Sequence, residues 1–529
     1  MTRSLLISCA LLALLAVPAQ AALEAPPMTL PGDAHAARAP ADPGTWIVAA
    51  RDAAAAAPIA RRYGAERVGS VGAHVVARRD ARAFAAALRR RGLLSFAEPN
   101  FLSRQRESGT DPFTSSARWR PIVVEDGLEP PAVVGGSPKL ALIDSKLDIT
   151  HPEFEGSRIT TVGSRPVQDE HGTATAAVAA APTNGRGIEG VWPGMIATNF
   201  DTNLSCGDIV HRIKAVVERG YDVLNMSYGA AEECFAESAE LQRATAAGVL
   251  LVAAAGNEFA EGNPLEYPAS LPHVVTVAAV DLNGETSYFS NANAAVDVAA
   301  PGERVWTAVP LAYDDFDRSR DGYTMVDGTS FASPIVAGVA SWVAADRPHL
   351  TVDQLANVVK LSAIDLDEDG WDPNTGYGLV QVGNALRMQA PRNDPYEPNE
   401  NIFWVNGDIL RHRAPRVFDG RPRHSRVRAR LDQFEDPADV YRVRFPGHSK
   451  TRITVNPSFG DTDVAVYRGS ADSTSAPPVG LSQRPGGARE RIVIQNAGRR
   501  RRAAFVEIYI DPVARGLDAG YALKFKRIR

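Results

Sequence analysis

Short apolar runs alternate with helix-like segments through the middle of the chain. The runs suited to buried strands fall at 140–143, 223–226, 250–253 and 274–280, and segments with helical signals separate them. Strands that alternate with helices in this way predict a parallel α/β sheet. We therefore expect an α/β unit in the central part of the chain.

The hydrophobic pattern changes to a period of two in the last quarter of the chain. Segment 393–399 is rich in proline and is interpreted as a linker. After it, apolar and polar side chains alternate in runs that Gly, Pro and Asp interrupt, at 440–445, 452–455, 464–467, 492–494, 505–510 and 521–525. This pattern predicts a β-sandwich over residues 391–529.

The first 21 residues have the pattern of a secretory signal peptide. Arg3 supplies the positive charge, residues 5–17 the apolar core, and Ala19-Gln-Ala21 the small residues of a cleavage site. No later stretch of the sequence reaches the length of a membrane span. The sequence therefore predicts a secreted protein, extracellular or in the cell envelope, with no membrane anchor.

A small α+β unit is predicted between the signal peptide and the central unit. Residues 22 to about 45 are rich in Ala and Pro and are interpreted as a linker. Strand-like and helix-like segments then alternate, at 45–49, 53–63, 74–77, 80–91 and 94–99. With 529 residues the chain is too long for one typical domain, so several units are expected.

Charge and cysteine content narrow the functional classes. The net charge of −5 and pI near 6.1 give no sign of a nucleic-acid partner, and the basic run at 499–502 is interpreted as a solvated turn. After signal cleavage only Cys206 and Cys234 remain. In an oxidising compartment they are expected to form a disulfide worth roughly 3–4 kcal/mol, with two separate buried thiols as the alternative.

Three polar residues in separate segments suggest acyl-transfer chemistry. Ser330 lies in Asp327-Gly-Thr-Ser-Phe-Ala-Ser-Pro334, before an apolar stretch that predicts a helix. We expect Pro334 in the first helical turn, where a missing N–H is tolerated. An isolated serine here would be an N-cap, but Asp144 ends an apolar run and His171 begins an Ala-rich one. A nucleophile, a base and an acid that orients the base form a complete set.

These motifs resemble the subtilisin-like serine proteases. The resemblance rests on 144–152 (Asp-Ser-x-x-Asp-x-x-His-Pro), 171–173 (His-Gly-Thr) and 328–334 (Gly-Thr-Ser-x-Ala-x-Pro), in that order, and on the Gly-Asn turn that ends 249–257. It implies a subtilisin-like catalytic domain at 107–390, a parallel sheet flanked by helices. Residues 22–106 resemble the linker and inhibitory propeptide of that family, and 391–529 the bacterial pre-peptidase C-terminal domain.

The resemblance implies a secreted serine endopeptidase that is made as a self-processed zymogen. The catalytic residues would be Asp144, His171 and Ser330, with Asn257 as an oxyanion donor, and the propeptide would act as an intramolecular inhibitor. Protein or peptide substrates would be the partners, and the chemistry would require no cofactor. Substrate binding is assigned to Ser227, Gly229, Glu258 and Glu266, and a structural calcium ion to Glu153 and Asn184.

Two of these assignments lead to more specific expectations. Glu258 and Glu266 at the primary pocket would favour Arg or Lys on the amino side of the cleaved bond, although a pocket for large apolar residues is the alternative. Counting forward from Ala97-Glu-Pro-Asn100, as in the family, places the end of the propeptide near Arg106, with Arg104 close by. The mature enzyme would therefore begin at or near Glu107.

Departures from the family pattern leave a second hypothesis open. Lys146 stands where the acid motif has glycine, and Ala174 where the base motif has a second histidine. The alternative is a catalytically weakened secreted binding protein that keeps the subtilase fold. A lipase-like hydrolase is disfavoured, because Ser330 lacks the Gly-x-Ser-x-Gly elbow.

Overall fold

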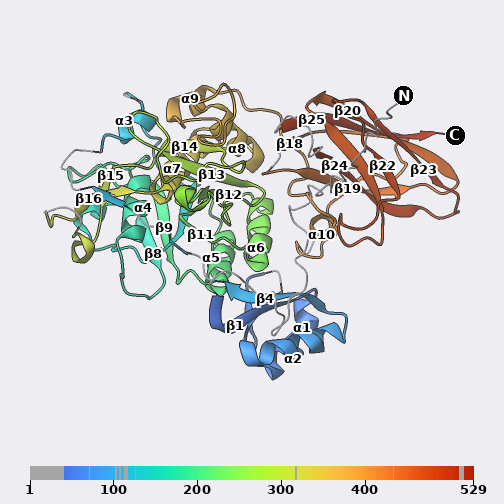
Figure 1. The fold of residues 1–529 in the computed structure, drawn as a ribbon, viewed down its shortest axis with the longest axis horizontal. Helices are drawn as coiled ribbons and strands as arrows, with labels where there is room; N and C mark the ends of the chain where they lie inside the picture. Colours follow the sequence, from blue (N-terminus) through green and yellow to red (C-terminus); the bar gives the residue numbers. More distant parts are fainter. Residues whose placement is uncertain are drawn as a thin grey trace, which may run out of the picture.

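The computed structural model describes residues 41–528, except 71, 102–103, 106–108, 112–116, 126, 316–318, 411–412, 433 and 511–517. Figure 1 shows a small α+β unit in blue, a large central α/β unit in cyan to yellow, and an all-β unit in orange to red. The predicted signal peptide and the predicted cleavage site after Arg106 lie outside the described residues.

Parallel strands form the central sheet, in the order β14-β13-β12-β10-β7-β9-β8. The four predicted strand runs all belong to it, which confirms the parallel α/β prediction. Strands β10, β12, β13 and β14 are buried along their whole length, because helices cover both faces of the sheet. The strands are β7 (Lys139–Asp144), β8 (Ile159–Val162), β9 (Ile196–Asp201), β10 (Val223–Met226), β12 (Leu250–Ala254), β13 (Val274–Val280) and β14 (Val298–Pro301).

Two pairs of helices cover this sheet. Helices α4 (His171–Ala180) and α7 (Thr329–Asp346) pack on one face, and α5 (Cys206–Glu218) and α6 (Phe235–Ala246) on the other. Residues 329–343 of α7 are all buried, as expected for a helix that is apolar on every side. The unit also contains β11 (Tyr228–Gly229), β15 (Val305–Ala308), β16 (Tyr323–Asp327), α3 (Arg120–Val123), α8 (Val352–Leu361), α9 (Val382–Arg387) and short 3₁₀ helices at Pro152–Phe154, Phe259–Glu261 and Leu311–Tyr313.

The N-terminal unit is an antiparallel sheet in the order β2-β3-β1-β4, with two helices on one face. Its other face packs against α5 and α6. The elements are β1 (Ala41–Ala50), α1 (Ala53–Arg62), β2 (Glu66–Val68), β3 (Ala73–Ala77), α2 (Arg78–Arg89) and β4 (Leu94–Phe101), followed by the short strands β5 (Arg104–Gln105) and β6 (Gly109–Asp111). All of the predicted segments are present, and β2 is an addition.

The C-terminal unit is a sandwich of two sheets, β17-β19-β24-β21-β22 and β18-β25-β20-β23, around a shared apolar core. Each predicted alternating run lies within a strand. Among the described residues, no helix combines the length and the apolar character needed to cross a bilayer. The elements are α10 (Ile402–Val405), β17 (Arg416–Phe418), β18 (His424–Asp432), β19 (Ala438–Phe445), β20 (Ser449–Phe459), β21 (Thr462–Arg468), β22 (Gly480–Ser482), β23 (Glu490–Asn496), β24 (Arg502–Ile510) and β25 (Asp518–Ile528).

Candidate active site

Asp144 and His171 meet at the carboxyl end of the central strands. Asp144 is the last residue of β7, and His171 is the first residue of α4. Asp144 Oδ1 lies 2.7 Å from His171 Nδ1, and both side chains are buried. The carboxylate also accepts the N–H of Ser145 at 2.7 Å and the hydroxyl of Thr175 at 3.0 Å. These bonds hold the carboxylate in place, so it can orient the imidazole.

The pKa of His171 is raised above its ordinary value. Burial by itself lowers the pKa of this imidazole, but the charge and hydrogen bond of Asp144, together with the charges of Asp169 and Glu170, outweigh burial. The other ring nitrogen, Nε2, is buried and has no hydrogen-bond partner among the described residues. With Nδ1 on a carboxylate, the imidazole is arranged to accept a proton at Nε2.

Ser330 lies in the first turn of α7, and its side chain is fully buried. The turn before it depends on Gly328, whose φ of 150° and ψ of 147° are rarely adopted by residues with a Cβ atom. N–H groups in a first helical turn have no partner within the helix, and the helix dipole adds positive potential there. The Ser330 hydroxyl therefore lies beside backbone donors that suit an anionic oxygen.

Two reciprocal hydrogen bonds join Ser330 to Ser227. Ser330 Oγ donates to the backbone carbonyl of Ser227 at 3.3 Å, and Ser227 Oγ donates to the backbone carbonyl of Ser330 at 2.8 Å. The second bond bears on Pro334, whose predicted position in the first turn is wrong. Because α7 begins at Thr329, Pro334 lies beyond that turn and removes the helical bond to the Ser330 carbonyl. The Ser227 hydroxyl replaces the missing donor.

Asn257 follows β12 and contacts the start of α7. Its Oδ1 accepts the N–H of Thr329 at 3.0 Å and the hydroxyl of Thr329 at 2.9 Å. These two bonds fix the orientation of the side-chain amide. Because Thr329 holds Oδ1, the Nδ2 amino group is the end of the amide that can donate to an oxygen near Ser330.

The predicted substrate-binding segment is paired with another part of the same chain. Strand β11 runs antiparallel to β5, with Gly229 opposite Arg104 and Tyr228 opposite Gln105. Strand β5 directly precedes the predicted end of the propeptide. The chain therefore pairs its own predicted cleavage region with the segment that was assigned to substrate binding.

The two predicted specificity carboxylates have different surroundings. Glu258 Oε2 accepts the backbone N–H of Asn257 at 2.8 Å. Glu266 is only 1% exposed, and its neighbour Tyr267 exchanges two backbone hydrogen bonds of 2.8 Å with Ala230. Glu266 therefore lies next to the segment that continues β11, whereas the Glu258 carboxylate is bonded to the adjacent backbone.

Glu153 and Asn184 are close together, but their contacts do not suit a calcium ion. Asn184 Nδ2 donates to the backbone carbonyl of Glu153 at 2.7 Å, and Glu153 Oε2 accepts the hydroxyl of Tyr323 at 2.6 Å. Burial raises the pKa of Glu153 to about 7, against the opposing effect of its hydrogen bonds. Calcium prefers several ionised or carbonyl oxygens, and Arg186 adds a positive charge to the same loop. The residues as arranged do not fit the predicted site.

The two departures from the family motifs are accommodated locally. Lys146 is not among the residues with positive φ, and its Nζ donates to the carbonyl of Gly163 at 2.9 Å. A glycine is therefore not needed at this position. Ala174 is fully buried in α4, and its carbonyl accepts the hydroxyl of Thr307 at 3.0 Å.

Three supporting contacts were not predicted from the sequence, although Ser227 itself was assigned to substrate binding. Thr175 bonds Asp144, Thr329 bonds Asn257, and the hydroxyl of Ser227 replaces a helical donor. Thr175 lies one helical turn after His171, on the same face of α4, so helical spacing could have identified it. The role of Ser227 depends on a contact between distant segments and has no local signal.

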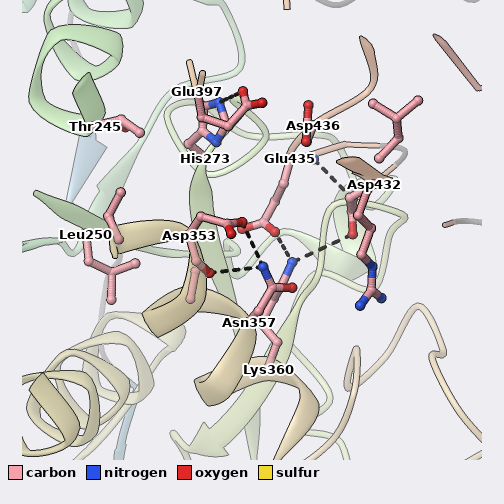
Figure 2. A pocket seen from close by; sticks show the side chains of 14 residues that line it. Thr245, Leu250, His273, Asp353, Asn357, Lys360, Glu397, Asp432, Glu435 and Asp436 are labelled. Atoms are coloured by element: carbon pink, nitrogen blue, oxygen red, sulfur yellow. Dashed lines mark hydrogen bonds and ion pairs between the residues drawn. The ribbon is translucent and has the colours of Figure 1, made fainter. Parts of the chain in front are cut away.

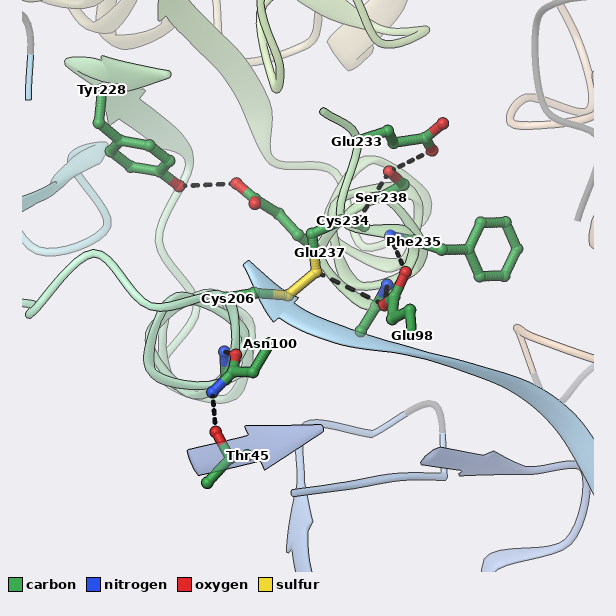
Figure 3. The surroundings of a disulfide bond; sticks show 12 residues. Thr45, Glu98, Asn100, Cys206, Tyr228, Glu233, Cys234, Phe235, Glu237 and Ser238 are labelled. Atoms are coloured by element: carbon green, nitrogen blue, oxygen red, sulfur yellow. Dashed lines mark hydrogen bonds between the residues drawn. A yellow bond between two sulfur atoms is a disulfide. The ribbon is translucent and has the colours of Figure 1, made fainter. Parts of the chain in front are cut away.

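Strand β4 caps two helices of the central unit (Figure 3). The Glu98 carboxylate accepts the N–H groups of Phe235 and Ala236, each at 3.1 Å, at the start of α6. Asn100 Oδ1 accepts the N–H of Gly207 at 2.9 Å, at the start of α5. Both side chains satisfy donors that a helix N-terminus leaves unpaired. The N-terminal unit is therefore docked through specific polar contacts.

The predicted disulfide between Cys206 and Cys234 is confirmed. Cys206 is the first residue of α5, and Cys234 immediately precedes α6. Figure 3 shows the bond beside Glu98 and Asn100. The disulfide thus joins the two helix starts that β4 caps.

Charged side chains gather where the central unit meets the sandwich (Figure 2). Lys360 of α8 forms ion pairs with Glu435, with Asp297 at 3.4 Å and with Asp432 at 3.7 Å. The cavity in Figure 2 measures about 50 Å³, too small for a peptide. Of the described residues, three groups here could hold a metal ion by the closeness of their ligand atoms: His273, Glu397 and Glu400; Asp297, Asp432 and Glu435; and Asp394, Glu397 and Asp436.

Comparison with known protein families matches residues 135–378 to the subtilase family. This segment contains Asp144, His171, Asn257 and Ser330. Subtilisin DY of Bacillus licheniformis is 30% identical over 278 residues, which are 50% of this chain and 97% of that protein. The chain belongs to the subtilase family.

Two further comparisons place this subtilase beside fervidolysin of Fervidobacterium pennivorans. The sequences are 32% identical over 288 residues, which are 48% of this chain and 41% of fervidolysin. The alignment therefore spans less than half the length of that relative. The crystal structure of fervidolysin, described as a keratinolytic enzyme related to subtilisin, matches with a TM-score of 0.55 and 18% identity over 85% of each chain. This likeness shows a shared fold.

Proposed function

We propose that this subtilase is a secreted serine endopeptidase that hydrolyses peptide bonds through an acyl-enzyme. The observation that carries the proposal is the buried contact of 2.7 Å between Asp144 and His171 next to the start of α7. The ring of His171 lies 5.4 Å from that of Phe331, the residue after Ser330. Nucleophile, base and acid are thus supplied by adjacent elements.

The first step is the attack of the Ser330 hydroxyl on the peptide carbonyl. Ser330 Oγ exchanges its bond to the Ser227 carbonyl for one to His171 Nε2, which takes the proton as Oγ attacks the peptide carbonyl. Asp144 stabilises the resulting imidazolium. The oxyanion accepts hydrogen bonds from the backbone N–H of Ser330 and from Nδ2 of Asn257. Loss of one such donor lowers kcat by a factor of about 10²–10³.

In the remaining steps the proton on His171 is passed to the leaving group. When the tetrahedral intermediate collapses, the C–N bond breaks and His171 gives its proton to the leaving amine. Water then attacks the acyl-enzyme, with His171 again taking and returning a proton. These steps release the acid product and restore the Ser330 hydroxyl.

We further propose that the N-terminal unit is an inhibitory propeptide that the enzyme removes itself. The pairing of β5 with β11 supports this, because it holds the residues before the expected cleavage site along the substrate segment. The capping contacts of Glu98 and Asn100 support the role of the unit as a docked inhibitor. The mature N-terminus would be Glu107 or a residue close to it.

A fluorophosphonate probe tests the function directly. It should label the wild-type protein and hydrolysis of casein should be measurable, whereas Ser330→Ala should show neither activity nor labelling and should keep its propeptide. Ser341→Ala is the matched control and should be labelled, because Ser341 lies in the same helix and its hydroxyl donates to the Ala337 carbonyl at 2.8 Å. A wild-type protein that resists the probe after maturation would favour the weakened binding protein instead.

A further inference from the structure

One face of the sandwich carries an unusual concentration of positive charge. In the sheet β18-β25-β20-β23, residues such as Val427, Ile453, Leu523 and Phe525 are buried in the sandwich core. Because side chains alternate along a strand, the residues between them lie on the opposite, outer face. The cationic residues of this outer face, here called the basic face, are Arg426, Arg428, Arg430, Lys450, Arg452, Arg491, Lys524 and Lys526.

The arrangement of these charges is unfavourable for the folded protein alone. Arg426 lies directly opposite Lys524, and Arg452 directly opposite Lys526. Like charges that face each other across strands are destabilising. Arg430 is paired with Asp518, whereas in the described part of the chain no ion pair joins any of the other seven cations of the basic face to a carboxylate. The protein as a whole has a net charge of −5, so these cations are segregated from an acidic remainder.

One end of the basic face is concave. A cavity of about 670 Å³ opens where the segment after α9 passes the sheet, and Arg392, Arg426 and Arg428 contribute to its wall. Neutral hydrogen-bonding side chains, Asn456 and Ser458, line it as well, and so does Asp394, whose carboxylate accepts the backbone N–H of Arg430 at 2.5 Å. Guanidinium groups bind carboxylates and sulfates with two parallel hydrogen bonds, and amide and hydroxyl groups suit the hydroxyls of a sugar.

The residues between the cations argue against two other anionic partners, single-stranded nucleic acid and a membrane surface. The outward positions of β18, β23, β25 and 449–456 of β20 carry no Phe, Tyr or Trp and a single imidazole, His424, whereas proteins that bind single-stranded nucleic acids stack successive bases on aromatic rings. Phe459, at the end of β20, is 48% exposed, and the guanidinium of Arg430 lies 5.7 Å from the centroid of its ring, at the edge of the basic face. A membrane-bound surface would present aromatic or other large apolar groups among its cations, and the basic face offers mainly Val493.

We propose that the basic face binds an acidic polysaccharide, a linear polymer of sugars that carry carboxylate or sulfate groups. The polymer lies across the strands and contacts several cations at once, and the concave end holds one charged sugar. This surface belongs to the sandwich and is separate from the catalytic residues. It would hold the enzyme on a polyanionic matrix through contacts that salt weakens.

Binding is measured with the full-length Ser330→Ala protein, which cannot digest itself, and fluorescein-labelled heparin as the probe. Fluorescence anisotropy at several salt concentrations gives Kd, and neutral dextran serves as a competitor. The test variant removes three charges from the basic face by Arg452→Gln, Lys524→Gln and Lys526→Gln. The matched control removes three exposed charges, two from the turn before β24 and one from the first residue of that strand, by Arg499→Gln, Arg500→Gln and Arg502→Gln.

We expect the test variant to bind heparin at least about tenfold more weakly than the parent at low salt, and the control to change by less than about threefold. Dextran should not compete. The test variant should also melt at a higher temperature without heparin, because opposed like charges are removed. Equal weakening in both variants would overturn the proposal, as would preferential binding to anionic vesicles or to single-stranded DNA. With Ser330 present, both triple variants should hydrolyse casein at the parental rate, so failure here leaves the proposed activity untouched.

Discussion

The carbonyl group of Ser330 links catalysis to the backbone of its helix. Pro334 removes the helical donor to this carbonyl, and the Ser227 hydroxyl supplies another at 2.8 Å. A buried carbonyl without a partner costs about 1–3 kcal/mol. Ser227 therefore stabilises the start of α7, and its own carbonyl holds the Ser330 hydroxyl until a substrate arrives.

Glu266 is the residue whose change should alter primary specificity. Within the proposed activity, we expect Glu266→Gln to lower kcat/KM for substrates with Arg at the cleaved bond by about 10- to 100-fold relative to Phe, the worth of one charged hydrogen bond. Glu258→Gln should alter this ratio by less than about twofold, because Glu258 already bonds the N–H of Asn257. Competing peptide substrates give both ratios, and wild-type cleavage chiefly after Phe or Leu would refute the assignment.

The sequence predicted these residues unequally, for a physical reason. Asp144, His171, Asn257 and Ser330 each stand in a short motif at the end of a strand or the start of a helix, so local chemistry points to them. The bond between Glu258 and its neighbouring backbone, and the placement of Pro334 beyond the first turn, depend on exact chain direction. Both features are local, but they became visible only once the path of the backbone was known.

Helix N-termini organise the functional parts of this subtilase. His171 begins α4 and Ser330 lies in the first turn of α7, where unpaired donors and the dipole favour negative charge. The starts of α5 and α6 instead receive Asn100 and Glu98 from strand β4. The unpaired N–H groups of helix N-termini thus lie beside the candidate catalytic residues on one face of the sheet and bind the N-terminal unit on the other face.

The short helix Pro152–Phe154 offers a test of the calcium prediction. The pKa of Glu153 is raised to about 7, mainly by burial, so the folded protein binds this proton more tightly than the unfolded chain. Its stabilising effect is complete below the unfolded pKa and is lost as pH rises through about 7. In the Ser330→Ala background, Glu153→Gln should therefore raise the free energy of unfolding at pH 8.5 by about 1–3 kcal/mol.

Chelation separates this explanation from a calcium site at Glu153. If Glu153 holds no calcium ion, any shift that EGTA causes in the melting midpoint should be equal in Glu153→Gln and in its parent. Glu155→Gln, at the exposed end of the same helix, is the control and should resemble the parent in both measurements. An EGTA effect that disappears only in Glu153→Gln, together with lower stability in calcium, would establish the predicted ion.

Most elements were predictable because their burial repeats with a clear period. Strands β7, β10, β12 and β13 of the central sheet are largely apolar runs, and the predicted strands of the sandwich alternate. Strands β8 and β9 contain Thr and Asn and were not predicted. Strand β2 escaped prediction because it has three residues, of which only Val68 is buried. Its position is set by pairing with β3 rather than by its own pattern.

At the scale of the whole molecule, polar contacts hold the three units together. Lys360 of the central unit pairs with Glu435 and Asp432 of the sandwich, while Glu98 joins the N-terminal unit to α6. Sequence alone placed these charges in separate segments and could not show that they meet. Because such contacts respond to protonation, the association of the units is expected to depend on pH.

Glu98 should make release of the proposed propeptide depend on pH. Burial raises the pKa of Glu98 to about 8, although the hydrogen bonds from two N–H groups of α6 act to lower it. In the released propeptide the pKa of Glu98 returns to its ordinary value of 4.5. The complex therefore binds this proton more tightly than the free parts do. Affinity is greatest below pH 4.5 and falls by up to about tenfold per pH unit until about pH 8.

The lag before casein hydrolysis by freshly processed precursor measures this release. We expect the lag to shorten steadily from pH 6 to pH 8 in the wild type, and to be nearly independent of pH in Glu98→Gln, which keeps an acceptor but cannot ionise. Asn100→Ala removes the neighbouring cap of α5, which does not titrate, so its lag should be shorter at every pH with the same slope. If Glu98→Gln kept the wild-type slope, another group would control release. Asn100 and Glu98 contact the starts of different helices, so we expect them to act independently. Loss of the pH dependence of the lag in Asn100→Ala would contradict this independence.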